Sequence, residues 1–180
     1  MVSLWLNLAE AENQHSLILQ HIRMLREVPG CESAWIVLAP ESNLGFEAQH
    51  YVATIQKAAV KDWVVITESG EGGIGFRTTA ETKEGGCTAV AELLAASGIF
   101  VAEHFVCASM APGEAVKMLV DQLDGYQVIV EAPKSAFGKT KRTYSGKVGG
   151  RQDDLAIALQ LGVLSARLFL RKDKYSKFRD

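Results

Sequence analysis

The segment GGRQDDLAIAL (149–159) decides how the fold is interpreted, because it joins a pair of acids to a regular helical pattern. Asp153 and Asp154 are followed by apolar residues at helical spacing, which predicts a helix over 153–169. Acids are favourable at helix N-termini, and successive helical residues point about 100° apart, so one aspartate can cap while the other faces inward. Two carboxylates at one site repel unless a cation lies between them, and such oxygen ligands suit Mg²⁺ or Mn²⁺.

The segment that precedes this acid pair is basic. Between Ala132 and Gln152 the chain has six lysines and arginines and no acid. Cations around a carboxylate metal site are what phosphodiester chemistry needs, since they hold the nucleic-acid backbone while the metal activates water. A solvated basic loop is the alternative interpretation. The basic residues are Lys134, Lys139, Lys141, Arg142, Lys147 and Arg151.

Further upstream, short apolar runs alternate with segments of helical spacing. Strands are predicted over 1–7, 34–39, 63–67, 99–106 and 126–132, and helices over 10–28, 43–59, 78–97, 112–124 and 153–169. This alternation predicts an α/β fold of three layers with a central sheet. The segment 133–150 is a long loop with room for a short hairpin, and long ordered loops are often functional.

Two positions in this predicted fold are of interest, a possible functional acid at Glu41 and a possible helix cap at Thr78. Glu41 directly follows the apolar strand 34–39, and a carboxylate at the end of a central strand faces the crevice where α/β proteins bind ligands. An ordinary helix entry explains the same residue. Thr78 and Glu81 have the spacing of a capping box at the start of the helix 78–97.

Composition limits the class of protein. The chain has 180 residues, 48% of them hydrophobic, which predicts one globular domain. Three scattered cysteines without zinc spacing predict a reducing compartment, and the absence of a long apolar run predicts an intracellular protein without a membrane partner. The net charge of −2 hides a split: residues 1–133 contain 7 basic and 17 acidic residues, whereas 134–180 contain 12 basic and 4 acidic. The nucleic-acid signal therefore lies in the second part.

Two glycine motifs point to nucleotides but do not fit. GEGGIG (70–75) follows a strand, yet it opens no helix and contains an acid that repels a pyrophosphate. GKT (138–140) would close a phosphate loop only if residue 133 were glycine, and that residue is Pro133. A nicotinamide-binding enzyme is accordingly the last of the alternatives.

Five stretches together resemble the nuclease domain of large terminases, the DNA-packaging motors of herpesviruses and tailed phages, and the last of them is the most specific. They are PESNLGFEA (40–48), GFRTTAETK (75–83), FVAEHFV (100–106), DQLDG (121–125) and SGKVGGRQDDLAIAL (145–159). The resemblance covers most of the chain. It implies an RNase H-like fold, with a mixed central sheet flanked by helices, and cleavage of concatemeric duplex DNA with two Mg²⁺ or Mn²⁺ ions.

The resemblance also implies roles for individual residues. Glu41 matches the second acid of the family's metal cluster, and Asp153 and Asp154 match the third, with Asp154 favoured as the inward ligand. These three residues are the expected catalytic and metal-binding set. Lys147 would lie near the scissile strand and Arg77 would contact a phosphate. The other expected DNA contacts are Lys134, Lys139, Lys141, Arg142 and Arg151.

The sequence departs from the family at its start. No aspartate precedes Asp62, so the family's first-strand aspartate is absent from the 180 residues. We therefore expect one nuclease domain over 1–180 that is incomplete at its N-terminus, lacks its first strand and has no ATPase domain. The expected partners are duplex DNA and packaging proteins, namely the ATPase domain, the portal and the small subunit. The expected location is the host nucleus for a herpesvirus-like protein and the host cytoplasm otherwise.

The missing aspartate leaves an alternative open, a catalytically impaired DNA-binding subunit of a packaging complex that keeps the nuclease-like fold. A further alternative is a different RNase H-like resolvase, which would share the acids but would not be expected to share the GFRTT and GGRQDD sequence motifs.

Overall fold

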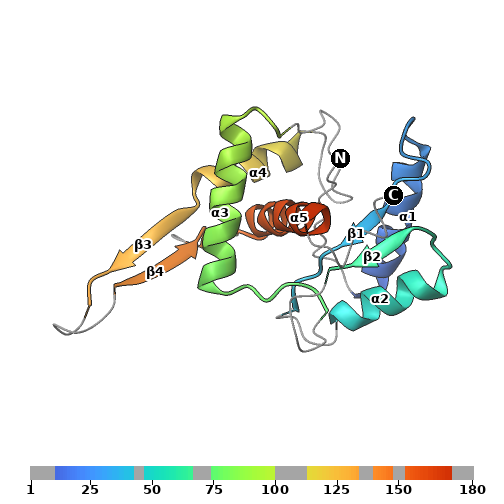
Figure 1. The fold of residues 1–180 in the computed structure, drawn as a ribbon, viewed down its shortest axis with the longest axis horizontal. Coiled ribbons are helices and arrows are strands. Elements are labelled where there is room, and N and C mark those ends of the chain that lie inside the picture. Colours follow the sequence, from blue (N-terminus) through green and yellow to red (C-terminus); the bar gives the residue numbers. More distant parts are fainter. Residues whose placement is uncertain are drawn as a thin grey trace. The chain divides into compact units, whose positions relative to one another are not determined.

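The computed structural model describes residues 11–42, 47–66, 74–99, 113–133, 140–147 and 153–171 (Figure 1). These residues form a mixed α/β protein with five helices and two small sheets. In chain order the elements are α1 (Ala11–Glu27), β1 (Ile36–Leu38), α2 (Glu47–Lys57), β2 (Trp63–Val65), α3 (Ala80–Ala95), α4 (Glu114–Asp124), β3 (Gln127–Glu131), β4 (Lys141–Ser145) and α5 (Asp154–Arg171).

The described residues divide into two compact units. Unit 1 contains those up to Thr78 together with those from Leu161 on, and unit 2 contains those from Thr79 to Gln160. Helix α5 thus contributes residues to both units. The prediction that residues 1–180 form a single nuclease domain stays a prediction.

Unit 1 is built around a parallel strand pair. β1 and β2 pair in the register Ile36↔Trp63, Val37↔Val64 and Leu38↔Val65. Parallel strands require a crossover connection, and α2 lies in the segment that connects these two. Buried apolar side chains from α1, α2 and the segments next to the strands contribute to the core of this unit. They include Ile22, Ile55, Ile66 and Phe76.

Arg26 stabilises the entry to both strands of unit 1. Its guanidinium donates hydrogen bonds to the carbonyls of Glu32 at 3.1 Å and Lys61 at 2.7 Å, and it lies 3.8 Å from the carboxylate of Asp62. A guanidinium presents several donors in a fixed plane, so one side chain can satisfy carbonyls of two separate loops. The end of α1 is thereby fixed against the residues that precede β1 and β2.

Unit 2 contains an antiparallel hairpin and the helices α3 and α4. β3 and β4 pair from Gln127↔Ser145 to Glu131↔Lys141, and Figure 1 shows the hairpin extending beyond α3. All five residues of β3 are exposed, whereas Tyr144 of β4 is buried. The apolar core of unit 2 lies elsewhere, on α3, α4 and the start of α5. It includes Ala89, Val90, Ala115, Leu119, Leu155, Ala156 and Leu159.

The secondary structure agrees with most of the expected elements. Seven of the described elements begin and end within two residues of a predicted helix or strand, and α2 begins four residues after its predicted start. β4 lies within the predicted loop 133–150, but it pairs with β3 at 127–131, so the hairpin is not contained in that loop as foreseen. The predicted strands over 1–7 and 99–106 lie outside the described residues, apart from residue 99. The described strands form two two-stranded sheets, so the RNase H-like central sheet stays a prediction.

The predicted capping box is wrong by one residue. Thr79, not Thr78, is the N-cap of α3: its hydroxyl accepts the N–H of Thr82 at 3.2 Å, and the Thr82 hydroxyl accepts the N–H of Thr79 at 2.7 Å. A threonine hydroxyl at the third helical position therefore does what a glutamate or glutamine usually does. Thr78 is left with a different partner.

None of the helices within the described ranges is both long and apolar enough to cross a membrane.

Candidate functional site

Asp153 occupies the N-cap position of α5 and is almost fully buried. Its carbonyl accepts the N–H of Ile157 at 2.9 Å, which is the first hydrogen bond of the helix. The whole residue is 2% exposed. A buried carboxylate is unfavourable unless its oxygens are hydrogen-bonded, so its partners decide its role.

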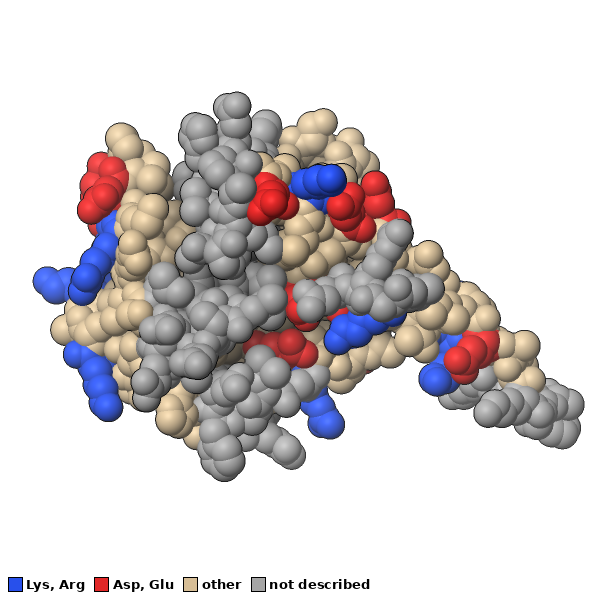
Figure 2. All heavy atoms as spheres, turned by 180° about the vertical axis from the view of Figure 1, so that it is seen from behind, with Lys and Arg blue, Asp and Glu red and all other residues tan. Residues whose placement is uncertain are grey.

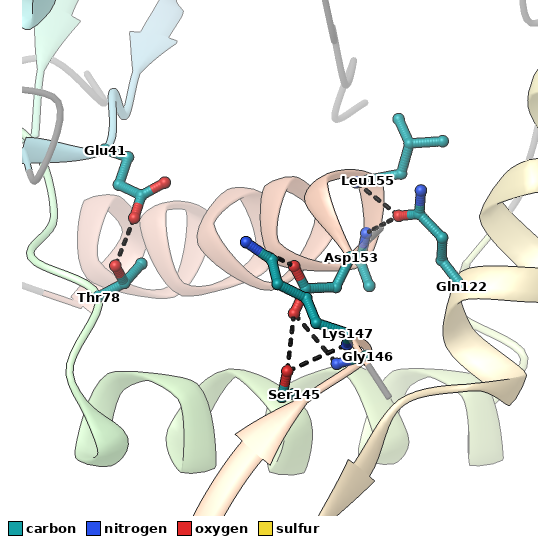
Figure 3. Close-up of polar contacts among 9 residues, drawn as sticks. Glu41, Thr78, Gln122, Ser145, Gly146, Lys147, Asp153 and Leu155 are labelled. Carbon is teal, nitrogen blue, oxygen red and sulfur yellow. Dashed lines mark hydrogen bonds and ion pairs between the residues drawn. The ribbon is translucent and has the colours of Figure 1, made fainter. Parts of the chain in front are cut away.

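The partners of the Asp153 carboxylate come from the turn that follows β4 (Figure 3). Oδ2 accepts the N–H of Gly146 at 3.0 Å and lies 3.5 Å from the hydroxyl of Ser145, a long and weak contact. Oδ1 lies 3.8 Å from Nζ of Lys147. The N–H of Lys147 donates to the Ser145 hydroxyl at 3.0 Å, which closes the turn. We call residues 145–147 the SGK turn.

Gly146 lies at the centre of the SGK turn, where there is no room for a side chain. A Cβ atom there would lie 2.8 Å from Cβ of Asp153 and 3.3 Å from the ring of Tyr126. The backbone of the turn can therefore approach the start of α5 only when residue 146 has no side chain.

The first turn of α5 is capped by a residue from another helix. The side-chain oxygen of Gln122, on α4, accepts the N–H groups of Leu155 at 2.7 Å and Ala156 at 3.1 Å (Figure 3). These are the groups that the side chain of an N-cap residue usually accepts. Because Gln122 takes this role, both carboxylate oxygens of Asp153 are directed at the SGK turn.

Asp154 lies in the first turn of α5 and is half-buried. Its negative charge is favourable there because of the helix dipole. The sequence favoured Asp154 as the inward residue, whereas the more buried side chain is that of Asp153. The oxygens of Asp153 are already engaged, so Asp154 is the more accessible carboxylate of the pair.

Tyr126 borders the same cluster with a buried hydroxyl. Among the described residues this hydroxyl has no hydrogen-bond partner of ordinary geometry. Burial raises its pKa to about 12, the charge of Asp153 acts in the same direction, and the amide of Gln160 opposes it. The neutral phenol is therefore strongly preferred in the folded chain.

We predict that this raised pKa makes stability fall in alkali. The unfolded phenol ionises near pH 10, so its stabilising contribution is complete below that pH and is lost as the pH rises to about 12. The loss should be about 1 kcal/mol, since the residue is half-exposed and screening reduces the effect. Urea unfolding at pH 9 and 11.5 would measure it, with Tyr126→Phe as the comparison. An equal fall in the Phe variant would assign the loss to other groups.

Glu41 is positioned by backbone pairing in unit 1. It forms an isolated parallel bridge with Phe76, in which the N–H of Phe76 donates to the carbonyl of Pro40 at 2.9 Å and that of Ser42 donates to the carbonyl of Phe76 at 2.7 Å. The Glu41 carboxylate accepts a hydrogen bond from the Thr78 hydroxyl (Figure 3). Thr78, which the capping prediction had misplaced, therefore orients the candidate acid.

Three of the predicted DNA contacts within the described ranges are basic side chains that each lie near a carboxylate. Nζ of Lys141 lies 3.5 Å from Glu131, Nη1 of Arg142 lies 3.3 Å from Glu84, and Lys147 pairs with Asp153. All three basic side chains are at least 60% exposed. In Figure 2 positive and negative side chains are likewise interspersed on the visible face. Arg77 is exposed, and Lys134, Lys139 and Arg151 lie outside the described residues.

The structure thus brings together Asp153, Lys147 and the neighbouring Asp154 in unit 2, and Glu41 with Thr78 in unit 1. In the described ranges no group of three or more acids, histidines or cysteines has the arrangement of a metal site. The three-acid metal cluster stays a prediction. The sequence did not indicate the contacts of Gln122, Gly146 and Thr78 with the candidate acids and α5, although all three lie in stretches that carry the terminase resemblance.

Comparison of the chain with protein families, curated proteins and solved structures found no match.

Proposed function

We propose that the chain is a metal-dependent endonuclease of the terminase type, with an RNase H-like fold, that cuts duplex DNA during viral DNA packaging. The observation that carries the proposal is the start of α5, where an adjacent acid pair lies against a turn that presents a lysine. The terminase resemblance of five collinear stretches supports the same function.

The carboxylates of the proposed site match Mg²⁺ or Mn²⁺ in kind. Asp154 is half-buried, and the Glu41 carboxylate accepts a hydrogen bond from Thr78. Hard oxygen ligands of this type are preferred by both ions. Asp153 fits less well as a direct ligand, because both of its oxygens have partners. From the terminase resemblance we propose Glu41 and Asp154 as the ligands, and from its own contacts we assign Asp153 to support of the SGK turn.

The chain's own residues would bind and orient the DNA. The side chain of Lys147 is 67% exposed while its partner Asp153 is buried, so the lysine can contact a backbone phosphate from the solvent side. A bound metal ion would supply an activated water for attack on phosphorus. Phosphate contacts carry no sequence information, so we expect cleavage with little sequence preference.

DNA binding would require the basic residues to exchange partners. Lys141 and Arg142 on the hairpin each lie near a carboxylate on the protein, so a phosphate must replace that carboxylate or add to it. Such ion pairs are weak at exposed positions, so replacing the carboxylate with a phosphate costs little free energy. We expect binding to weaken steeply with salt, as counterion release requires.

The decisive experiment is plasmid cleavage by the purified chain in Mn²⁺ or Mg²⁺. Glu41→Gln and Asp154→Asn should each reduce the cleavage rate by about 100-fold, because changes to the outer partners of metal ligands alone cost about 10–100-fold. Asp124→Asn, an exposed acid at the end of α4, is the matched control and should cleave normally. Cleavage that survives in both site variants would contradict the proposed ligands.

The second candidate function is a DNA-binding subunit of a packaging complex that keeps the fold without the chemistry. It is favoured by the engagement of Asp153, whose oxygens already bind Gly146 and Lys147. Salt-sensitive DNA binding without cleavage, unchanged by Glu41→Gln and Asp154→Asn, would support it. In either case we propose packaging proteins as partners, namely the ATPase domain, portal and small subunit. We propose the host nucleus or host cytoplasm as the location.

A further inference from the structure

We propose that Gln122 is a positioning residue: by capping α5 it keeps the Asp153 carboxylate on the SGK turn and so fixes Lys147 for contact with a phosphate. The effect on DNA rests on the proposed function, whereas the conformational effect does not.

The N–H groups of a first helical turn have no partner within the helix and compete for any nearby acceptor. At α5 the natural acceptor is the side chain of Asp153, which occupies the N-cap position. Instead, the amide oxygen of Gln122 accepts the N–H groups of Leu155 and Ala156 at 2.7 and 3.1 Å. Because both partners are N–H donors, only the oxygen of the amide can face them.

The Asp153 carboxylate is therefore available to the SGK turn. It binds the N–H of Gly146 at 3.0 Å and lies 3.8 Å from the Lys147 ammonium. Gln122 and Asp153 are both buried, so neither can exchange its partners for water at low cost. Removal of the Gln122 oxygen leaves two buried N–H groups without that acceptor, and Asp153, at the N-cap position, is placed to replace it.

Replacement of Gln122 should accordingly move Asp153 from the turn to the helix. In Gln122→Met, which keeps the length and loses the acceptor, we expect Asp153 to cap α5 in the usual way. The N–H of Gly146 then loses its carboxylate and Lys147 loses its anchor. Gln122→Glu keeps an oxygen at the same position and should preserve the arrangement.

Amide hydrogen exchange of the ¹⁵N-labelled full chain tests this transfer. In Gln122→Met the exchange rate at Gly146 should rise about tenfold or more, since a hydrogen bond to a charged acceptor is lost. The amides of Leu155 and Ala156 should stay protected, and Gln122→Glu should match the wild type at all three positions. Faster exchange at Leu155 and Ala156, with the rate at Gly146 unchanged, would show that Gln122 only caps the helix and would contradict the proposal. A uniform rise at all three, or a Glu variant that behaves like Met, would also overturn the proposal.

Binding of a duplex oligonucleotide separates this inference from the proposed function. Gln122→Met should weaken binding in the same direction as Lys147→Ala, by a smaller factor, because the lysine is still present but no longer anchored. If the wild-type chain does not bind DNA, the proposed function fails while the exchange result stands. If DNA binding is intact in Gln122→Met although Gly146 has lost protection, the positioning role of Gln122 is wrong.

Discussion

Gly75→Ala should lower the free energy of unfolding by about 2–5 kcal/mol, because it combines a strained backbone with a direct clash. Gly75 has a φ of +84°, and an added Cβ atom would lie 1.9 Å from the carbonyl oxygen of Pro40. That oxygen belongs to the backbone and accepts the N–H of Phe76, so it cannot move without breaking the bridge beside Glu41. Urea unfolding followed by circular dichroism would measure the loss.

Gly30 provides the matched control for this prediction. It has the same φ of +84°, but among the described residues no atom beyond its two chain neighbours lies within 4 Å of the position a Cβ would occupy. Gly30→Ala therefore carries only the cost of the left-handed conformation, about 1–2 kcal/mol. The difference between the variants measures the contact with Pro40. Equal losses would mean that the backbone at Phe76 shifts freely, and that Glu41 is not held by its bridge to Phe76.

The helices were predictable from the sequence because each carries its own local pattern. The leucines after Asp154 recur at helical spacing, and α5 indeed begins at Asp154. β4 is less predictable. Of its five residues KRTYS only Tyr144 is buried, so the alternation typical of a strand is too short to separate it from a basic loop.

The partners within the candidate site could not be predicted, because they are separated by long stretches of chain. Gln122 precedes Leu155 by 33 residues, and a glutamine in an amphipathic helix is ordinarily interpreted as solvent-exposed. The exchange of Thr78 for Thr79 as the cap has a similar origin. Two adjacent threonines satisfy the same local pattern, and the distant Glu41 decides which one is free to cap.

The second large effect concerns the neighbouring acids Asp153 and Asp154. We expect substitution of Asp153 to lower mainly stability and substitution of Asp154 to lower mainly activity. Asp153→Ala should lower the free energy of unfolding by about 2–4 kcal/mol, because it leaves the buried N–H of Gly146 without an acceptor and opens a small cavity. Asp154→Ala should cost about 1 kcal/mol or less, the value of an acid at a helix N-terminus. Urea unfolding of the two variants tests this difference.

Asp153→Asn separates two contributions to the stability lost in Asp153→Ala, the hydrogen bond to Gly146 and the charge beside Lys147. The asparagine keeps one oxygen for the N–H of Gly146 but has no charge for Lys147, so it should recover most of the stability if the hydrogen bond dominates. The Lys147 side chain is mostly exposed, and its pairing with Asp153 should therefore contribute little. A loss in Asp153→Asn equal to that in Asp153→Ala would assign the energy to the charge instead.

Cleavage assays on the same variants connect this prediction to the proposed function. If Asp154 is the metal ligand, Asp154→Ala is nearly as stable as the wild type yet inactive. Asp153→Ala, assayed in the absence of denaturant where it is still folded, keeps measurable cleavage with weaker DNA binding. The reverse pattern, an inactive Asp153→Asn and an active Asp154→Ala, would make the buried aspartate the ligand. It would then have to release Gly146 and Lys147 whenever a metal ion binds.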